Sequence, residues 1–296
     1  MKNNVYKIVS VIFLTLFSFY YTNKTIDIIR ETDPIMKEIK KSNNKYYKKA
    51  IDAKVSKNTI IPGLTGRKIN YKKSFKKMKK YGNYNEALTV FKETKPTISI
   101  DNIYNRYIKV GNNEKKSVSL VLKIEKDTNI DNIKNINNIL VNKNIKSTIF
   151  IDGLFLENNL DLVNTFINSE LEILNYDNSY KEIYFSSAIN YLNNITGKSA
   201  KYCYADYDNE EIINLCSKLK LHTILPTIKV GNYPYKEIKN KLQNASIISI
   251  PINTSTEIEL STVIDYIKSR GYTFMTLDEL LNESYDKWLK ILNKML

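Results

Sequence analysis

Residues 116–151, KSVSLVLKIEKDTNIDNIKNINNILVNKNIKSTIFI, decide the fold class of this chain. Val118–Leu122 and Ser147–Ile151 are short, apolar runs with several β-branched residues, which is typical of buried strands. Between them, Ile130–Val141 has apolar residues at helical spacing. A strand, a helix long enough for a crossover and a second strand together predict two parallel strands of an α/β fold.

The same alternation continues toward the C-terminus. Five more strands are predicted at residues 171–174, 201–205, 223–225, 246–250 and 273–275, and further helices at residues 160–167, 187–195, 210–219 and 257–268. Right-handed crossovers between parallel strands would close such a unit into a distorted (β/α) barrel. In a barrel of this kind the functional side chains lie at the C-terminal ends of the strands.

The composition of the 296-residue chain excludes several classes of protein. A content of 43% hydrophobic and 26% charged residues excludes collagen-like, fully disordered and polytopic membrane proteins. Two cysteines are too few for a disulfide framework or a thiolate zinc cluster. The single histidine, His222, excludes any site that needs two imidazoles, and we expect it to be a structural residue.

Positive charge is concentrated in one block of the sequence. The chain carries 45 Lys and Arg against 31 Asp and Glu, a net charge of +14, and residues 37–80 alone hold sixteen basic and two acidic residues. Such a block predicts contact with a polyanion, either nucleic acid, anionic lipid or an anionic wall polymer. The alternative is a solvated lysine-rich face. The candidate polyanion-binding residues are Lys72, Lys73, Lys76, Lys77, Lys79 and Lys80.

The first 24 residues have the pattern of a targeting segment. Lys2 and Lys7 precede an uncharged, largely apolar stretch from Ile8 to Asn23. A signal peptide, a short anchor and an interfacial helix all fit this length. Because no pair of small residues suited to cleavage follows, we predict retention as a single-pass anchor in the cell membrane, with the C-terminal domain outside the cytoplasm. The basic block would then face wall polymers or headgroups, and we expect no nucleic acid as a partner.

The sequence divides into four predicted parts. These are a signal-anchor or transmembrane segment (residues 1–24), a basic stalk and accessory region (25–113), an α/β barrel (114–285) and a C-terminal helical tail (286–296). Within the accessory region, Pro62-Gly63 and Thr65-Gly66 predict a structural turn between two short extended pieces.

Several segments between residues 116 and 283 resemble the NodB-type polysaccharide deacetylases. The closing segment GYTFMTLDELL, Gly271–Leu281, is similar to the family's "GY-FVTL-ELL" and is the most specific of them. Similar segments are Val118–Leu122, Asn144–Gly153, Leu171–Ile173 and Ala245–Ile250. The resemblance implies a distorted (β/α) barrel and an enzyme that removes acetyl groups from N-acetylated sugars of chitin-like or peptidoglycan glycans.

The resemblance also implies a catalytic centre that this sequence lacks. The family holds a divalent metal such as zinc on one Asp and two His, and a second Asp accepts a proton from the metal-bound water. At the positions of the Asp pair this chain has Lys123 and Ile124. At the positions of the two His it has Tyr176 and Tyr180, and Pro251 replaces a later His. We therefore predict an inactive pseudoenzyme with no catalytic residue, no metal ligand and no cofactor.

Some alternatives remain open for the barrel. Glu125 and Asp127, with loop carboxylates elsewhere, could form an all-oxygen metal site, and the chain would then be an active metal-dependent deacetylase of N-acetylated cell-wall polysaccharide with a non-standard site. The loop carboxylates in question are Asp152, Asp177, Asp206 and Asp208. The simpler interpretation is a set of solvated carboxylates. Cys203 and Cys216 either form a disulfide in an exported chain or are buried separately.

Tyrosines gather in the segments that would form the mouth of the barrel. Tyr176, Tyr180, Tyr202 and Tyr204 are candidate glycan-binding residues, because aromatic faces stack on sugar rings and phenols bind hydroxyls. Some clustering is expected among 22 tyrosines, and part of the set could be core. The sequence predicts a membrane-anchored, non-catalytic deacetylase-like protein whose partner is cell-wall glycan or an anionic wall polymer. An intracellular nucleic-acid binder remains only if the N-terminal segment does not export the chain.

Overall fold

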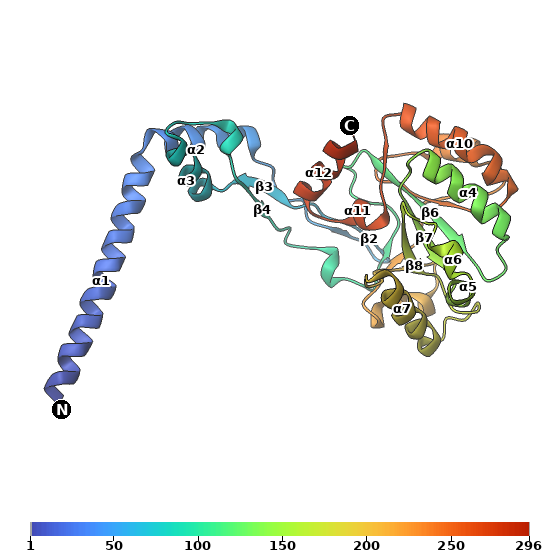
Figure 1. Cartoon of the computed structure of the whole chain (residues 1–296), viewed down its shortest axis with the longest axis horizontal. Coiled ribbons are helices and arrows are strands. Elements are labelled where there is room, and N and C mark those ends of the chain that lie inside the picture. Colours follow the sequence, from blue (N-terminus) through green and yellow to red (C-terminus); the bar gives the residue numbers. More distant parts are fainter. Residues whose placement is uncertain (1, 296) are drawn as a thin grey trace. The chain divides into compact units, whose positions relative to one another are not determined.

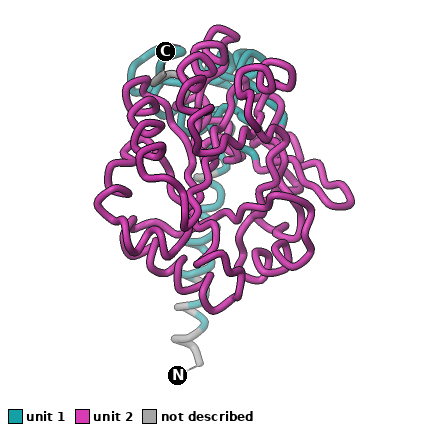
Figure 2. The backbone as a smooth tube through the Cα atoms, turned by 90° about the vertical axis from the view of Figure 1, so that its right-hand side faces the viewer, with its two compact units in different colours: residues 1–49, 66–94 teal, residues 50–65, 95–296 magenta. Residues whose placement is uncertain are grey.

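The computed structural model describes residues 2–295 and divides the chain into two compact units. Unit 1 comprises residues 1–49 and 66–94, and unit 2 comprises residues 50–65 and 95–296 (Figure 2). Residues 50–65 and 95–113, which the sequence assigned to the accessory region, therefore belong to the same unit as the predicted barrel. The reason is that they supply strands to one of its sheets.

The first sheet of unit 2 contains the strands that the sequence identified most clearly. Its order is β11-β12-β6-β7-β8, all parallel, and β13 also pairs with β6. The strands are β6 (Ser117–Ile124), β7 (Ser147–Ile151), β8 (Ser169–Ile173), β11 (Ile228–Lys229), β12 (Ile247–Ile250) and β13 (Thr273–Phe274). Each strand predicted in this part of the chain is confirmed within two residues, and the two-residue β11 was missed.

The second sheet of unit 2 joins strands from distant parts of the sequence. Its order is β1-β2-β5-β10-β9, parallel except for the β1–β2 pair. The strands are β1 (Lys54–Val55), β2 (Thr59–Ile61), β5 (Tyr107–Ile108), β9 (Tyr202–Tyr204) and β10 (His222–Ile224). The sequence predicted β9 and β10. It did not predict that β2 and β5 would pair beside them, because strands this short carry no readable periodicity.

Helices of unit 2 pack against strands of both sheets. The longer ones are α4 (Ile130–Asn142), α7 (Glu182–Thr196), α8 (Glu210–Lys218) and α10 (Thr254–Ser269), and all four were predicted. The remaining ones are α5 (Gly153–Asn158), α6 (Leu160–Val163), α9 (Pro234–Lys241), α11 (Leu277–Leu281) and α12 (Tyr285–Met295). Figure 1 shows α4 and α10 side by side next to β6.

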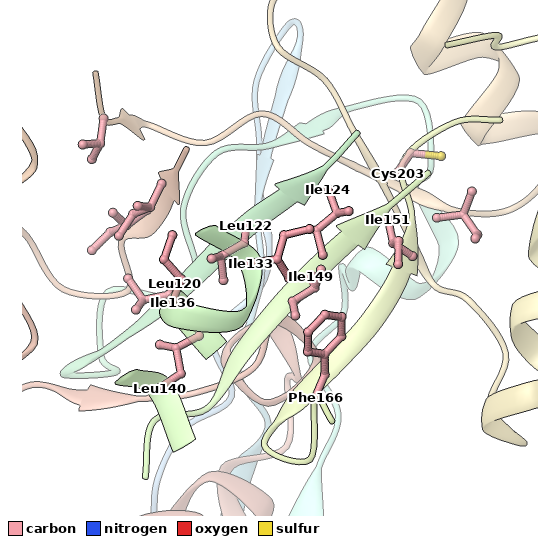
Figure 3. Packing of buried hydrophobic residues seen from close by; sticks show 14 of the residues in the cluster. Leu120, Leu122, Ile124, Ile133, Ile136, Leu140, Ile149, Ile151, Phe166 and Cys203 are labelled. Carbon is pink, nitrogen blue, oxygen red and sulfur yellow. The ribbon is translucent and has the colours of Figure 1, made fainter. Parts of the chain in front are cut away.

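Strand β6 is buried on both faces, and its side chains alternate between two cores. Leu120, Leu122 and Ile124 pack with the helices, as Figure 3 shows for their contact region with α4. Val121 belongs to the second core, which also contains Phe150, Tyr202 and Tyr204 and fills the space between the two sheets. Because strand side chains alternate with period two, Lys123 points the same way as Val121, toward this interior.

The two sheets are not joined by strand pairing between β8 and β9, which are the terminal strands of their sheets in the described structure. The Glu172 side chain takes the place of a strand partner there. Its Oε2 accepts the backbone N–H groups of Lys201 at 2.9 Å and Tyr202 at 3.2 Å. Glu172 is only 1% exposed, and burial raises the pKa of its carboxyl well above the usual value of 4.5.

A disulfide bond ties the second sheet to a helix. Cys203 in β9 and Cys216 in α8 are bonded, with 6.1 Å between their Cα atoms. The sequence had left this pairing open. Closing a loop of this length stabilises a fold by roughly 3 kcal/mol in the chain-entropy description.

Unit 1 is built from helices and a small antiparallel hairpin. Its elements are α1 (Lys2–Thr32), α2 (Pro34–Tyr46), β3 (Gly66–Ile69), α3 (Tyr71–Tyr81) and β4 (Phe91–Thr94). Ile39, Ile69 and Met78 form its core. The segment predicted as an anchor, residues 1–24, falls on α1. Among the described residues, no helix combines the length and the apolarity that crossing a bilayer requires.

We expect Glu172→Ala to lower the free energy of unfolding by roughly 2–4 kcal/mol, because two buried N–H groups lose their acceptor. Glu172→Gln keeps an acceptor in place and should cost much less. Since the pKa of Glu172 is raised in the folded state, the wild type loses stability as pH rises from 4.5 through the folded-state pKa. The Gln variant should lack this loss.

Urea unfolding of the three proteins at several pH values measures these differences. The Glu172 assignment is wrong if the Ala and Gln variants are equally stable at every pH.

Candidate functional site

The C-terminal ends of the parallel strands form the mouth of the barrel-like unit. Lys123 lies at the end of β6, Asp152 follows β7, and Tyr176 follows β8. Asp206 follows β9 on the opposite sheet. The loops that the sequence predicted to carry the site are thus brought to one end of the fold.

Lys123 is the central group of this mouth. Its Nζ donates to both carboxylate oxygens of Asp206, at 2.8 and 3.0 Å, and lies 3.5 Å from Oε1 of Glu125. The ammonium also sits 5.2 Å from the centre of the Tyr204 ring. The Lys123 side chain is 22% exposed, so this cation is only partly screened by water. The position is a direct result of the alternation along β6, which aims Lys123 inward.

The neighbouring carboxylates are also engaged in local interactions. Oδ1 of Asp152 accepts the N–H groups of Leu154 at 3.0 Å and Phe155 at 3.1 Å, which caps α5. Burial raises the pKa of Asp152 despite these bonds. Asp177 pairs with Lys126 at 2.6 Å. Of the carboxylates considered for an all-oxygen metal site, Asp152 thus caps a helix, while Glu125, Asp177 and Asp206 lie against lysines.

The residues of the mouth do not fit the divalent metal that the resemblance implies. Within residues 2–295, no three His, Cys, Asp or Glu side chains gather in a way that could hold a metal ion. The Lys123 ammonium lies beside two carboxylates of the mouth, Asp206 and Glu125. A fixed positive charge at this point repels a dication. We derive no metal chemistry for this chain.

The four candidate glycan-binding tyrosines separate into two pairs. Tyr176 and Tyr180 are partly exposed and belong to the loop after β8. Tyr202 and Tyr204 are 4% and 1% exposed and belong to the interior core. A sugar ring cannot stack on an enclosed side chain, so Tyr202 and Tyr204 form part of the scaffold. The side chains alternate along β9, which turns both tyrosines inward and Cys203 outward.

The position of the Tyr176 ring requires a residue without a side chain at position 153. Its ring lies against Gly153, where an added Cβ would approach Cδ2 of Tyr176 to 2.6 Å. On its other side it stacks on Tyr184, with 5.9 Å between the ring centres, and its hydroxyl donates to Glu157 at 3.3 Å. Tyr184 and Tyr207 are both exposed. The exposed aromatic surface near the mouth therefore comes from Tyr184 on α7 and Tyr207 after β9, with part of Tyr176, and the sequence put only Tyr176 among its four leading candidates.

The six candidate polyanion-binding lysines lie on α3 of unit 1. Four of them line one hollow of about 460 Å³ together with Val90: Lys73, Lys76, Lys77 and Lys80. No ion pair to a carboxylate of the described residues is found for these four. Lys79 instead pairs with Asp33 at 2.7 Å, and Lys72 is not among the lining residues.

Comparison with known proteins identifies the fold. BA3943 from Bacillus anthracis, described as a CE4 family pseudoenzyme, is 21% identical with a TM-score of 0.65, over 86% of this chain and 96% of that chain. A mutant of BA3943 is described as having restored enzymatic activity. PdaA from Bacillus subtilis, a family 4 carbohydrate esterase, is 16% identical with a TM-score of 0.52, over 60% of this chain and 85% of that one.

Among curated proteins, the uncharacterized protein YlxY of Bacillus subtilis (strain 168) is 21% identical over 280 residues, which is 88% of this chain and 87% of YlxY. No protein-family model matches the chain. The chain has the fold of the CE4, or NodB-type, polysaccharide deacetylases, as the sequence predicted. The likeness to BA3943 extends over a larger share of the chain than the likeness to PdaA.

Replacing the central cation tests the electrostatic description of the mouth. We expect Lys123→Asp to be destabilised without metal, because it brings a third carboxylate toward Asp206 and Glu125, and to regain stability when Mn²⁺ is added. The wild-type melting temperature should not respond to Mn²⁺. Thermal unfolding with and without the ion measures both effects.

The control is Lys126→Asp, which removes a lysine that pairs with a single carboxylate, Asp177. It should show no response to Mn²⁺. A wild-type chain that Mn²⁺ stabilises as strongly as it stabilises Lys123→Asp would contradict the description.

Proposed function

We propose that this chain, with its CE4 fold, is a non-catalytic protein of the cell envelope that binds cell-wall glycan or an anionic wall polymer. It is held at the cell membrane through α1, with unit 2 outside the cytoplasm. The observation that carries the proposal is the Lys123 ammonium, paired with Asp206 at the mouth. It stands where hydrolysis of an acetamide by this fold needs a metal ion and a proton acceptor.

The chemistry of amide hydrolysis supports the absence of catalysis. A water molecule needs activation by a metal or a general base, and the carbonyl oxygen needs a positive partner as charge develops on it. Lys123 could stabilise negative charge, but Asp206 and Glu125 already neutralise it. Asp152, the other carboxylate at the mouth, is buried and caps α5. The description of BA3943 as a pseudoenzyme agrees with this view.

The lysines of α3 support the binding of an anionic polymer. Lys73, Lys76, Lys77 and Lys80 line one hollow, and no ion pair within the described structure neutralises them. Four ammonium groups on one helix attract a polymer with regularly spaced negative charges, and salt screens this attraction. The partly exposed ring of Tyr176 and the exposed ring of Tyr184 offer an aromatic surface for a sugar at the mouth of unit 2.

Two features support the location outside the cytoplasm. The Cys203–Cys216 disulfide is of the kind that persists in oxidising compartments. Helix α1 exposes large apolar side chains at every position between Val11 and Tyr21 except Thr15 and Ser18, and a membrane would cover them. Outside the cell, wall polymers rather than nucleic acid are the available polyanions.

The absence of catalysis is tested by acetate release. We expect the purified full-length chain to release no acetate from N-acetylated chitooligosaccharide or peptidoglycan, with or without Zn²⁺, Co²⁺, Mn²⁺ or Mg²⁺. An active family 4 carbohydrate esterase on the same substrates is the positive control. Metal-dependent release that a chelator abolishes would overturn the proposal.

Binding is tested by sedimentation with cell walls. Replacing Lys73, Lys76, Lys77 and Lys80 by Gln should weaken binding about tenfold, which corresponds to roughly 1.4 kcal/mol, and the remaining binding should depend less on salt. The matched control replaces four exposed lysines of unit 2, Lys134, Lys198, Lys236 and Lys239, so that the net charge is the same. Equal loss of cell-wall binding in both variants would show that binding depends only on the total charge of the protein.

Walls stripped of their anionic polymer separate the two partners. If the anionic polymer is the partner, the wild type should lose binding to stripped walls. If glycan is the partner, binding to stripped walls should persist and should fall in a Tyr176→Ala, Tyr184→Ala variant. Unchanged binding by both variants to both kinds of wall would remove α3 and the mouth as binding surfaces.

A further inference from the structure

A second pocket lies at the end of unit 2 that faces away from the mouth. It is formed at the N-terminal ends of β9 and β10, by the segment 95–104 and by the residues that follow α11, and its volume is about 540 Å³. This volume is within the range of sites for small molecules. All of its lining residues belong to unit 2.

The wall of this pocket contains the single histidine of the chain. The His222 ring stacks on Tyr104, with 4.6 Å between ring centres and 22° between planes. His222 is 8% exposed, and burial lowers its pKa to about 4, so the imidazole is neutral at physiological pH. Its Nδ1 is buried with no partner in the described structure. The pocket wall thus holds a polar atom whose hydrogen bond is missing.

The pocket also carries an excess of positive charge. Lys201 is paired with Asp278 at 2.5 Å. Lys95, Lys220 and Lys287 line the same pocket and form no ion pair with a described carboxylate. The acidic side chains cannot balance three ammonium groups. Those not paired with a lysine are Asp101 and Glu283, and Oε1 of Glu283 already accepts the N–H groups of Gly63 and Ile100.

We infer that this pocket binds a small phosphorylated polyol, such as a sugar phosphate. A phosphate monoester carries nearly two negative charges near neutral pH. Its oxygens can therefore form ion pairs with the unpaired ammonium groups of Lys95, Lys220 and Lys287. A hydroxyl of the polyol can donate a hydrogen bond to Nδ1 of His222. Other hydroxyls can exchange hydrogen bonds with the hydroxyls of Thr97 and Ser99, which also line the pocket. The site is independent of α3 and of the mouth.

Lys220 offers a variant that separates binding from folding. Its backbone is left-handed, with φ of 56°, a conformation that glycine adopts at lower cost than lysine. Lys220→Gly therefore removes an ammonium group from the pocket while the fold is kept or stabilised. Lys218→Ala is the matched control, because Lys218, the last residue of α8, lies two positions before Lys220 in the sequence, outside the pocket, and pairs with Glu182.

The imidazole signals of the only histidine provide a direct readout by NMR. In the full-length protein in a mild nonionic detergent, glucose 6-phosphate should shift the His222 signals in a saturable way, and glucose should not. Lys220→Gly should weaken this binding about tenfold, with an unchanged or higher melting temperature, whereas Lys218→Ala should bind like the wild type. His222→Phe, which keeps the stacking on Tyr104, should also bind more weakly by calorimetry.

Three results would overturn the inference. One is the absence of any saturable shift with glucose 6-phosphate. Another is equal affinity of the wild type and Lys220→Gly. The third is equal binding of inorganic phosphate and glucose 6-phosphate, since the pocket would then hold an anion without recognising the polyol.

Discussion

The burial of β6 on both faces is the constraint on which the rest of unit 2 depends. A parallel strand covered on both sides must be apolar nearly throughout, and its alternate side chains must fill two separate cores. Leu120 and Leu122 face the helices while Val121 faces the second sheet. A shift of one residue would exchange these sets, so the register of the whole first sheet is fixed by this strand.

The same alternation of side chains along β6 determines which charged groups meet at the mouth. It carries Lys123 to the inner face at the end of β6, where the cation meets Asp206 from the second sheet. The ion pair at this point joins the ends of the two sheets and engages Asp206, with Glu125 beside it. The fold of the CE4 deacetylases is therefore combined with a mouth in which Lys123 and its neighbouring carboxylates neutralise one another.

The contact between the two sheets relies on groups other than strand pairing. Glu172 satisfies the N–H groups of Lys201 and Tyr202 where β8 and β9 do not pair. The Cys203–Cys216 bond fixes the outer side of β9 to α8. At the N-terminal ends of β9 and β10, the chain leaves a pocket with uncompensated lysines and the buried ring of His222. The two ends of unit 2 thus differ in charge. The lysines at the mouth are paired with carboxylates, whereas three lysines of the pocket at the opposite end are not.

The sequence by itself determined the strands of the first sheet apart from β11, and the four longer helices of unit 2, since their periodicity is local. It also determined that no site with two imidazoles can form, since His222 is the only histidine. Only the tertiary structure decided that Tyr176 is partly exposed while Tyr204 is buried, that Lys123 pairs with Asp206, and that short strands from the accessory region join the barrel unit. These outcomes depend on which residues far apart in the chain become neighbours, and local periodicity carries no information about such contacts.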